Sequence, residues 1–347
     1  MYELPAQQIT VFRLALFFCC VGYCAVAYYV LKPCGRQIPA AIMAAWTQFS
    51  VGVLLDIFSV RLGFWTYRPM EWSLGNVPLD LHLDWTFIWG FAFVWLASRL
   101  RLFGREPIAV ATYLVAWTLI TVAFDAAFGR HLPFLQTSAP LWWMGDAVLV
   151  FVLLAVTLWV YGGILHPPTM PAWHRWNCCV RSVLYVSSLM YAFYVYLPQV
   201  ILTLTGDSAV RPLFPLTDLQ VLALVALPAF ALGSWAMWAF ADEGGGTPIP
   251  LDPPVRLVEG GPYAYVRNPM QISGMWLAVV LVMVYPTKFI LFYLFDMAIT
   301  AIVLMSLFEQ AQLRNRFGRT YEQYERELSN WIPRLPVRSK QAKRNPR

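Results

Sequence analysis

Long apolar runs recur along almost the whole chain and leave it few folds. Hydrophobic residues make up 59% of the 347 residues and charged residues only 13%, whereas a soluble domain carries roughly 25% charge. A helix that crosses a bilayer needs roughly 20 apolar residues. We therefore predict an all-α, polytopic transmembrane helical bundle of about nine spans. The candidate spans are 9–31, 38–60, 85–100, 108–127, 141–165, 180–204, 219–241, 272–285 and 289–308.

The distribution of Lys and Arg predicts the orientation of the bundle. Ten of the 25 basic residues lie between Arg314 and Arg347, and the positive-inside rule places such a segment in the cytoplasm. Counting back through nine spans puts the N-terminus outside and assigns Arg175 and Arg181 to a cytoplasmic loop. We expect an integral protein of a bacterial inner (plasma) membrane. The basic tail Lys340–Arg347 is expected to be attracted to anionic lipid head groups, and no nucleic-acid partner is expected.

Proline and glycine divide the chain. The segment 166–171 contains three prolines and separates a predicted N-terminal bundle, 1–165, from a second transmembrane domain, 172–347. We expect the N-terminal bundle to hold a lipid or an apolar substrate. The stretch from Asp242 to Tyr263 is so rich in Gly and Pro that it does not continue a helix. Its length predicts a functional loop rather than a minimal connection.

Two polar motifs flank the last pair of apolar segments. The first reads G-P-Y-A-Y-V-R-N-P-M at 261–270, and the second begins at Glu309 and closes with Pro333-Arg334-Leu335-Pro336. Because one apolar hairpin joins them, both motifs lie at the same membrane face, the cytoplasmic one. Arg267, which precedes a helix-starting proline, offers an anion-binding corner. Glu309 offers a carboxylate for an ammonium group or ribose hydroxyls. Together they suit a zwitterionic nucleoside ligand; otherwise both residues only anchor helix ends.

A surface helix is predicted from Glu309 to Leu328, where good helix formers are frequent. Its apolar residues recur at helical spacing and form one stripe. The helix either lies on the membrane interface or covers a cofactor, and the two roles are compatible. The stripe consists of Leu313, Phe317, Tyr321, Tyr324 and Leu328.

Taken together, these motifs resemble the isoprenylcysteine carboxyl methyltransferase superfamily, which is similar in turn to the phospholipid N-methyltransferases. The resemblance rests on G-P-Y-x-x-x-R-N-P-M followed by E-x-x-x-L-x-x-x-F-G-x-x-Y-x-x-Y, and it covers roughly the last 100 residues. It implies an integral membrane enzyme that uses S-adenosylmethionine, with a cofactor site within 260–336 and a lipophilic acceptor. No catalytic residue is assigned. By resemblance the cofactor-binding residues are Tyr263, Arg267, Asn268, Pro269, Met270 and Glu309, with Tyr321 and Tyr324 on the closing helix.

Three positions depart from that pattern and keep two other functions open. Gln271 stands where the family often has Tyr, Ser273 stands where it has a small Gly, and Gln310 replaces the second Glu of a Glu-Glu pair. One alternative is an NADPH-dependent membrane reductase of the sterol-reductase type. The other is a non-enzymatic lipid-binding bundle with a vestigial cofactor site.

A weaker resemblance lies in the N-terminal half. Residues 54–85 resemble the repeat of small membrane carotenoid cyclases, with Asp80 and Asp84 near the paired carboxylates of that family. This favours a bundle that holds a long apolar substrate, although an aromatic-rich interfacial loop has the same composition.

Five charged residues are taken as membrane-embedded, where ionisable groups are costly and often functional. Pairing of Arg13 with one of the embedded aspartates is the simplest expectation. No metal site is predicted, because the four His residues fall in separate predicted loops and no metal-ligand spacing occurs. The embedded charges are Arg13, Asp56, Asp125, Asp146 and Asp296.

Overall fold

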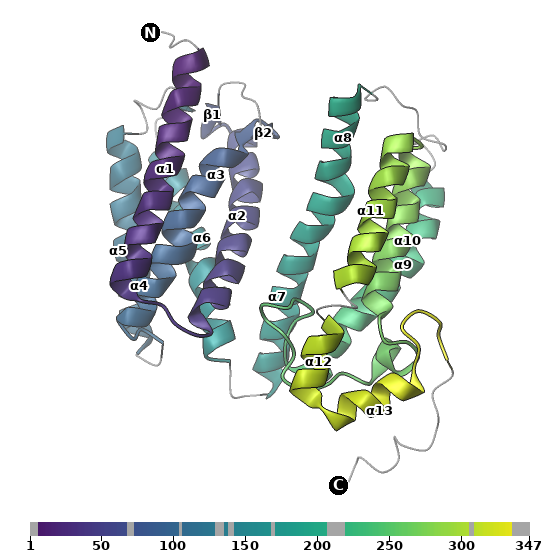
Figure 1. The fold of residues 1–347 in the computed structure, drawn as a ribbon. Coiled ribbons are helices and arrows are strands. Elements are labelled where there is room, and N and C mark those ends of the chain that lie inside the picture. The colour runs from purple at the N-terminus through teal and green to yellow at the C-terminus, as the bar shows by residue number, and fades with distance from the viewer. Residues whose placement is uncertain are drawn as a thin grey trace. The chain divides into compact units, whose positions relative to one another are not determined.

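The structure is a computed structural model that describes residues 6–67, 73–103, 106–128, 135–137, 142–167, 171–206, 219–304 and 309–334. The basic tail, the end of the closing motif (335–336) and His131 lie outside the described residues. The chain divides into two compact units, Met1–Pro168 and Thr169–Arg347, which are coloured purple to blue and teal to yellow in Figure 1. Each unit is described by itself.

The N-terminal unit is a helical bundle with two short strand pairs. β1 pairs antiparallel with β4 so that Trp65 lies opposite Thr137, and β2 pairs with β3. α2 presents buried alanines to its neighbours, and a Cβ at Gly90 would lie 2.5 Å from the Ala45 side chain. Small residues of this kind allow close helix packing in membranes. The elements are α1 (Ala6–Leu31), α2 (Gln37–Arg61), β1 (Trp65–Tyr67), β2 (Ser73–Leu74), β3 (Val77–Pro78), α3 (Leu79–Trp85), the π-helical η1 (Thr86–Phe93), α4 (Val94–Arg99), α5 (Pro107–Phe128), β4 (Leu135–Thr137) and α6 (Trp142–Leu165).

A buried polar cluster lies at one end of this unit. The Asp56 carboxylate accepts hydrogen bonds from Trp65 Nε1 at 2.6 Å and from the Tyr67 hydroxyl at 2.8 Å, and His82 Nε2 lies 2.9 Å away. His82 belongs to α3, so its predicted loop position is wrong. Arg13 forms an ion pair with Asp80 rather than with an embedded aspartate as expected.

The C-terminal unit carries both polar motifs. Figure 1 shows α12 and α13 lying across one end of the helices α9, α10 and α11. α9 and α10 approach closely because Ser273 Oγ donates to the Ala229 carbonyl at 2.7 Å and lies beside Gly233. The serine that replaces the family glycine therefore supplies an interhelical hydrogen bond. The elements are α7 (Pro171–Tyr191), η3 (Ala192–Tyr196), α8 (Leu197–Thr205), α9 (Leu219–Ala239), η5 (Phe240–Gly244), η6 (Gly261–Ala264), α10 (Pro269–Val284), α11 (Lys288–Leu304), α12 (Gln310–Phe317) and α13 (Arg319–Glu327).

The predicted class, an all-α polytopic membrane bundle, is confirmed, whereas the count of nine spans is not. Six helices among the described residues are long and apolar enough to cross a membrane, and Pro269–Val284 is a shorter apolar helix. The predicted span 85–100 is divided among α3, η1 and α4. The six are Ile9–Leu31, Gln37–Arg61, Pro107–Ala127, Trp142–Leu165, Ala172–Thr205 and Ala223–Gly244.

The single amphipathic surface helix predicted over 309–328 is wrong in one respect. The segment forms two helices, α12 and α13, which meet at Gly318. Gly318 has φ 52° and ψ −129°, a backbone conformation that is essentially restricted to glycine. The glycine therefore turns the chain between two helices whose apolar residues still face the same side, with Tyr321 and Tyr324 buried.

Candidate functional site

Backbone hydrogen bonds join the two polar motifs. The Arg267 amide donates to the Ser329 carbonyl at 3.0 Å, and the Arg334 amide donates to the Tyr265 carbonyl at 2.9 Å. The segment after α13 therefore lies against the segment before α10, as the hairpin argument predicted.

The start of α10 fixes the first motif. Pro269 occupies the first turn of α10 and is buried, where its missing N–H is not needed. The Asn268 side chain donates to the Asn330 carbonyl at 3.3 Å. Met270 packs against an apolar cluster that includes Tyr263. Met270 thus packs behind Tyr263, and neither Pro269 nor Met270 lines the cavity between the two motifs.

A cavity of about 410 Å³ lies between the two motifs, within the usual range for small-molecule sites. Six of the eight residues suggested by resemblance line it, and Pro269 and Met270 do not. The rest of the lining consists of Phe240, Pro248, Ile249, Pro250, Pro253, Pro254, Leu257, Val258, Gln271, Ala301, Gln312, Leu313, Arg316 and Phe317. The six are Tyr263, Arg267, Asn268, Glu309, Tyr321 and Tyr324.

Arg267 is held by a carboxylate that sequence reasoning missed. Its Nη1 donates to Glu325 Oε1 at 3.0 Å, and Glu325 also receives Arg314 at 2.8 and 3.0 Å. Hydrogen bonds from Arg314, and then from Arg267, lower the pKa of Glu325 below its ordinary value of 4.5. Arg267 Nε is buried and has no hydrogen-bond partner among the described residues, and the Arg267 side chain lines the cavity. Glu325 directly follows Tyr324, but on an amphipathic helix it reads as an ordinary solvent-facing charge.

Glu309 precedes α12 and supplies a carboxylate to the cavity lining. Gln271 Nε2 donates to its Oε2 at 3.3 Å. Crowding by protein atoms raises the pKa of Glu309 above 4.5, and the Gln271 hydrogen bond opposes that rise. The side chain keeps an accessible face, so it is open to a ligand. Gln310, the departure from the Glu-Glu pair, does not line the cavity.

Three tyrosines form an aromatic part of the wall. The Tyr324 hydroxyl donates to the Tyr263 carbonyl at 2.8 Å, which ties α13 to the first motif. The rings of Tyr321 and Tyr324 lie 6.2 Å apart. Burial raises the pKa of both hydroxyls, so both remain neutral hydrogen-bond donors at physiological pH.

The Gly- and Pro-rich loop predicted to be functional forms the remaining wall. Glu243 accepts a hydrogen bond from the Gly260 amide at 2.9 Å, which closes the loop at its base. A Cβ at Gly246 would lie 2.5 Å from the Pro254 backbone, so the two strands of the loop approach too closely for a side chain there. From the other side, Arg316 Nη2 donates to the Pro254 carbonyl at 2.8 Å. Sequence reasoning identified this loop but not Arg316.

An apolar groove adjoins the polar cavity. It has a volume of about 910 Å³ and is lined mainly by apolar side chains of α7, η3, α10 and α11. Gln271 and Ala301 line both the groove and the cavity. The C-terminal unit therefore places a charged, aromatic cavity next to a groove suited to a long apolar group.

Residues 221–320 match the model of the phospholipid methyltransferase family. The matched segment runs from α9 into the start of α13 and contains most of the cavity lining, whereas the N-terminal unit lies outside it. This match confirms the resemblance to the isoprenylcysteine and phospholipid methyltransferase superfamily and supports a membrane methyltransferase. Searches of curated proteins and of solved structures give no match.

Proposed function

We propose that the C-terminal unit, with its match to the phospholipid methyltransferase family over 221–320, is an S-adenosylmethionine-dependent methyltransferase that acts on a lipophilic acceptor. One observation carries the proposal: a cavity lined by opposite charges and aromatic rings shares Gln271 and Ala301 with an apolar groove. A cofactor that is charged and nucleoside-like and an acceptor that is apolar then meet at one boundary.

The residues of the cavity fit this cofactor. The unpartnered Arg267 Nε suits its carboxylate, and charge-assisted hydrogen bonds of this kind are the strong ones. Glu309 suits the ammonium group or the ribose hydroxyls. Phe317 and the prolines of the loop offer apolar surfaces for the adenine. When bound, the cofactor would supply a methyl group attached to a sulfonium sulfur, and the thioether S-adenosylhomocysteine would be the leaving group.

The protein contributes alignment more than acid–base chemistry. Holding two reactants in register converts a bimolecular step into an effectively unimolecular one. Arg267, Glu309 and the tyrosines fix the cofactor, while the groove fixes the apolar part of the acceptor beside Gln271. The Tyr324–Tyr263 hydrogen bond holds α13 against the first motif at the cavity.

The acceptor enters the groove from the bilayer. Among the described residues the groove lies along helices α7, α10 and α11 and is lined by exposed side chains such as Phe295 and Trp276. An acyl or isoprenoid chain fits such a surface. The methyl group is transferred to the nitrogen, oxygen or sulfur atom of its head group, which is an amine, hydroxyl, carboxylate or thiol. Under the positive-inside orientation the cofactor arrives from the cytoplasm.

The test is transfer of radiolabelled methyl groups from S-adenosylmethionine into a total membrane lipid extract by the full chain in detergent. We expect a labelled lipid, identified by chromatography and mass spectrometry, and release of S-adenosylhomocysteine. A cofactor screen by thermal shift runs alongside. Stabilisation by NADPH, with none from S-adenosylmethionine or S-adenosylhomocysteine, overturns the proposal in favour of a reductase. Absence of any labelled lipid together with absence of cofactor binding favours a lipid-binding bundle.

A further inference from the structure

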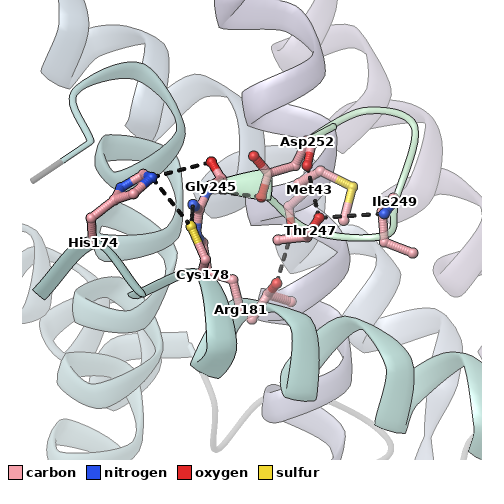
Figure 2. A network of polar contacts seen from close by, with 9 residues as sticks. Met43, His174, Cys178, Arg181, Gly245, Thr247, Ile249 and Asp252 are labelled. Atoms are coloured by element: carbon pink, nitrogen blue, oxygen red, sulfur yellow. Dashed lines mark hydrogen bonds and ion pairs between the residues drawn. The ribbon is translucent and has the colours of Figure 1, made fainter. Parts of the chain in front are cut away.

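Helix α7 is tied to the loop that forms one wall of the cavity, and Figure 2 shows the contacts. Arg181 Nη1 lies 2.8 Å from Asp252 Oδ2, and the two side chains are only 2% and 9% exposed. Two turns earlier, His174 Nε2 lies 3.1 Å from the Gly245 carbonyl oxygen; His174 belongs to α7, so its predicted loop position is wrong. Sequence reasoning assigned Arg181 to a cytoplasmic loop as an orienting charge. The loop position is wrong for both Arg175 and Arg181, because both lie within α7, where Arg181 is buried.

The part of the loop that Arg181 holds is a tight unit. The Thr247 amide and hydroxyl both donate to the Asp252 carbonyl, at 3.0 and 2.9 Å, and the Asp252 amide donates to the Ile249 carbonyl at 3.0 Å. Pro248 and Pro250 lie within this turn. Because these bonds join residues 247–252 to one another, a displacement of Asp252 moves the turn as a whole.

The inner surface of the same turn belongs to the cavity. Pro248, Ile249 and Pro250 all line it, together with Pro253 and Pro254. Arg316 of α12 holds the Pro254 carbonyl from the other side. The loop wall therefore contacts α7 through Arg181 and α12 through Arg316. Its distance from the rest of the cavity depends on both arginines.

We infer that Arg181 is a positioning residue for the cofactor cavity: through Asp252 it sets the place of the 247–252 turn. A buried ion pair is weak evidence for stability, because the cost of desolvation offsets the Coulombic attraction, so we assign this pair a role in fixing the geometry of the turn. Arg181 does not line the cavity, so it acts only through the turn. The inference rests on the proposed function for the identity of the cavity's ligand.

Two variants separate positioning from stability. Arg181→Met removes the positive charge 2.8 Å from the buried Asp252 carboxylate, so it loses both the tie and some thermal stability. The double variant Arg181→Met/Asp252→Asn removes both charges, and replacement of a whole buried pair is often neutral for stability. Arg175→Gln is the matched control on the same helix, since its ion pair with Asp242 is exposed, at 49% and 39%, and exposed pairs contribute little.

Two readouts are measured on the full chain in detergent: the dissociation constant of S-adenosylhomocysteine and the rate of tryptic cleavage after Arg256, an exposed loop residue. We expect both Arg181 variants to bind S-adenosylhomocysteine at least about tenfold more weakly than wild type and to be cleaved faster by trypsin. We expect the double variant to melt near the wild-type temperature and the Arg175 control to match wild type in both readouts. The KM for the lipid acceptor should stay unchanged in all of them.

The outcomes distinguish the two proposals. Unchanged cleavage in both Arg181 variants overturns the positioning role, whatever the affinity. Faster cleavage with unchanged affinity also overturns it, as does recovery of affinity together with stability in the double variant. If the wild-type chain binds neither S-adenosylmethionine nor S-adenosylhomocysteine, the proposed function fails, while the cleavage rates still decide whether Arg181 anchors the loop.

Discussion

Replacement of Arg267 by Gln is the sharpest test of the cavity. The substitution removes the Nη1 contact to Glu325 and the guanidinium group of a residue that lines the cavity. Glu325 is not left alone, because Arg314 still donates to both of its carboxylate oxygens. The variant should therefore keep α13 in place and lose mainly its interaction with the ligand.

The magnitude follows from the contacts. A hydrogen bond to a charged group contributes about 1.5–3 kcal/mol, and about 1.4 kcal/mol corresponds to a factor of ten in affinity. Loss of one such bond to the cofactor carboxylate should raise the dissociation constant roughly tenfold to a hundredfold. The loss of one contact among the three that Glu325 receives should lower the melting temperature by only a few degrees, consistent with about 1 kcal/mol.

The assay is equilibrium binding of S-adenosylhomocysteine to the detergent-solubilised chain, with a thermal melt of each variant. Arg314→Gln is the control, because Arg314 shares the Glu325 partner but does not line the cavity and its side chain is 52% exposed. It should bind within about twofold of wild type. Wild-type affinity in Arg267→Gln, or an equal loss in Arg314→Gln, would refute the assignment of Arg267 to the cofactor.

Three further outcomes are expected. The pKa of Glu309 is raised above 4.5, and only its ionised form attracts an ammonium group. As the pH is lowered, cofactor affinity should therefore begin to fall at a higher pH than it would with an ordinary glutamate at this position. Binding titrations across pH measure this, and Glu309→Gln should abolish that dependence. Asp56→Ala leaves the buried Trp65 and His82 and the partly buried Tyr67 without their acceptor, at about 1–3 kcal/mol for each buried partner. It should therefore lower the melting temperature while S-adenosylhomocysteine affinity stays constant, and a parallel loss of affinity contradicts this separation. Ala298→Phe narrows the apolar groove and should raise the KM of the lipid acceptor in steady-state assays without changing cofactor affinity, and an unchanged KM rejects the groove as the acceptor site.

Hydropathy predicted helices well where an apolar run ends sharply. The span predicted at 38–60 is α2, Gln37–Arg61. It predicted the start of α7 poorly, at 180 instead of Pro171, because the first turns mix exposed Trp173 and Trp176 with polar residues. A helix that extends beyond its apolar stretch is invisible to a hydropathy window.

The candidate site was predictable to the extent that its residues lie in motifs. Arg267 and Glu309 stand beside apolar segments whose hairpin topology brings them to one face. Arg181 and Glu325 were not predictable as site residues, because their roles depend on partners 71 and 58 positions away. A charge in a helix reads as a topogenic or solvent-facing residue until packing supplies its partner.

The backbone contacts between the motifs also impose an order on biosynthesis. Tyr263 and Arg267 are made before the α10–α11 hairpin, whereas the residues that hold them, Tyr324 and Ser329, are made after it. Both helices of the hairpin must therefore be inserted before the cavity can close. A nascent chain halted between Arg267 and Tyr324 carries the arginine of the first motif but no enclosed cavity. Ligand binding therefore becomes available only to chains that have inserted the hairpin and have been synthesised through Ser329.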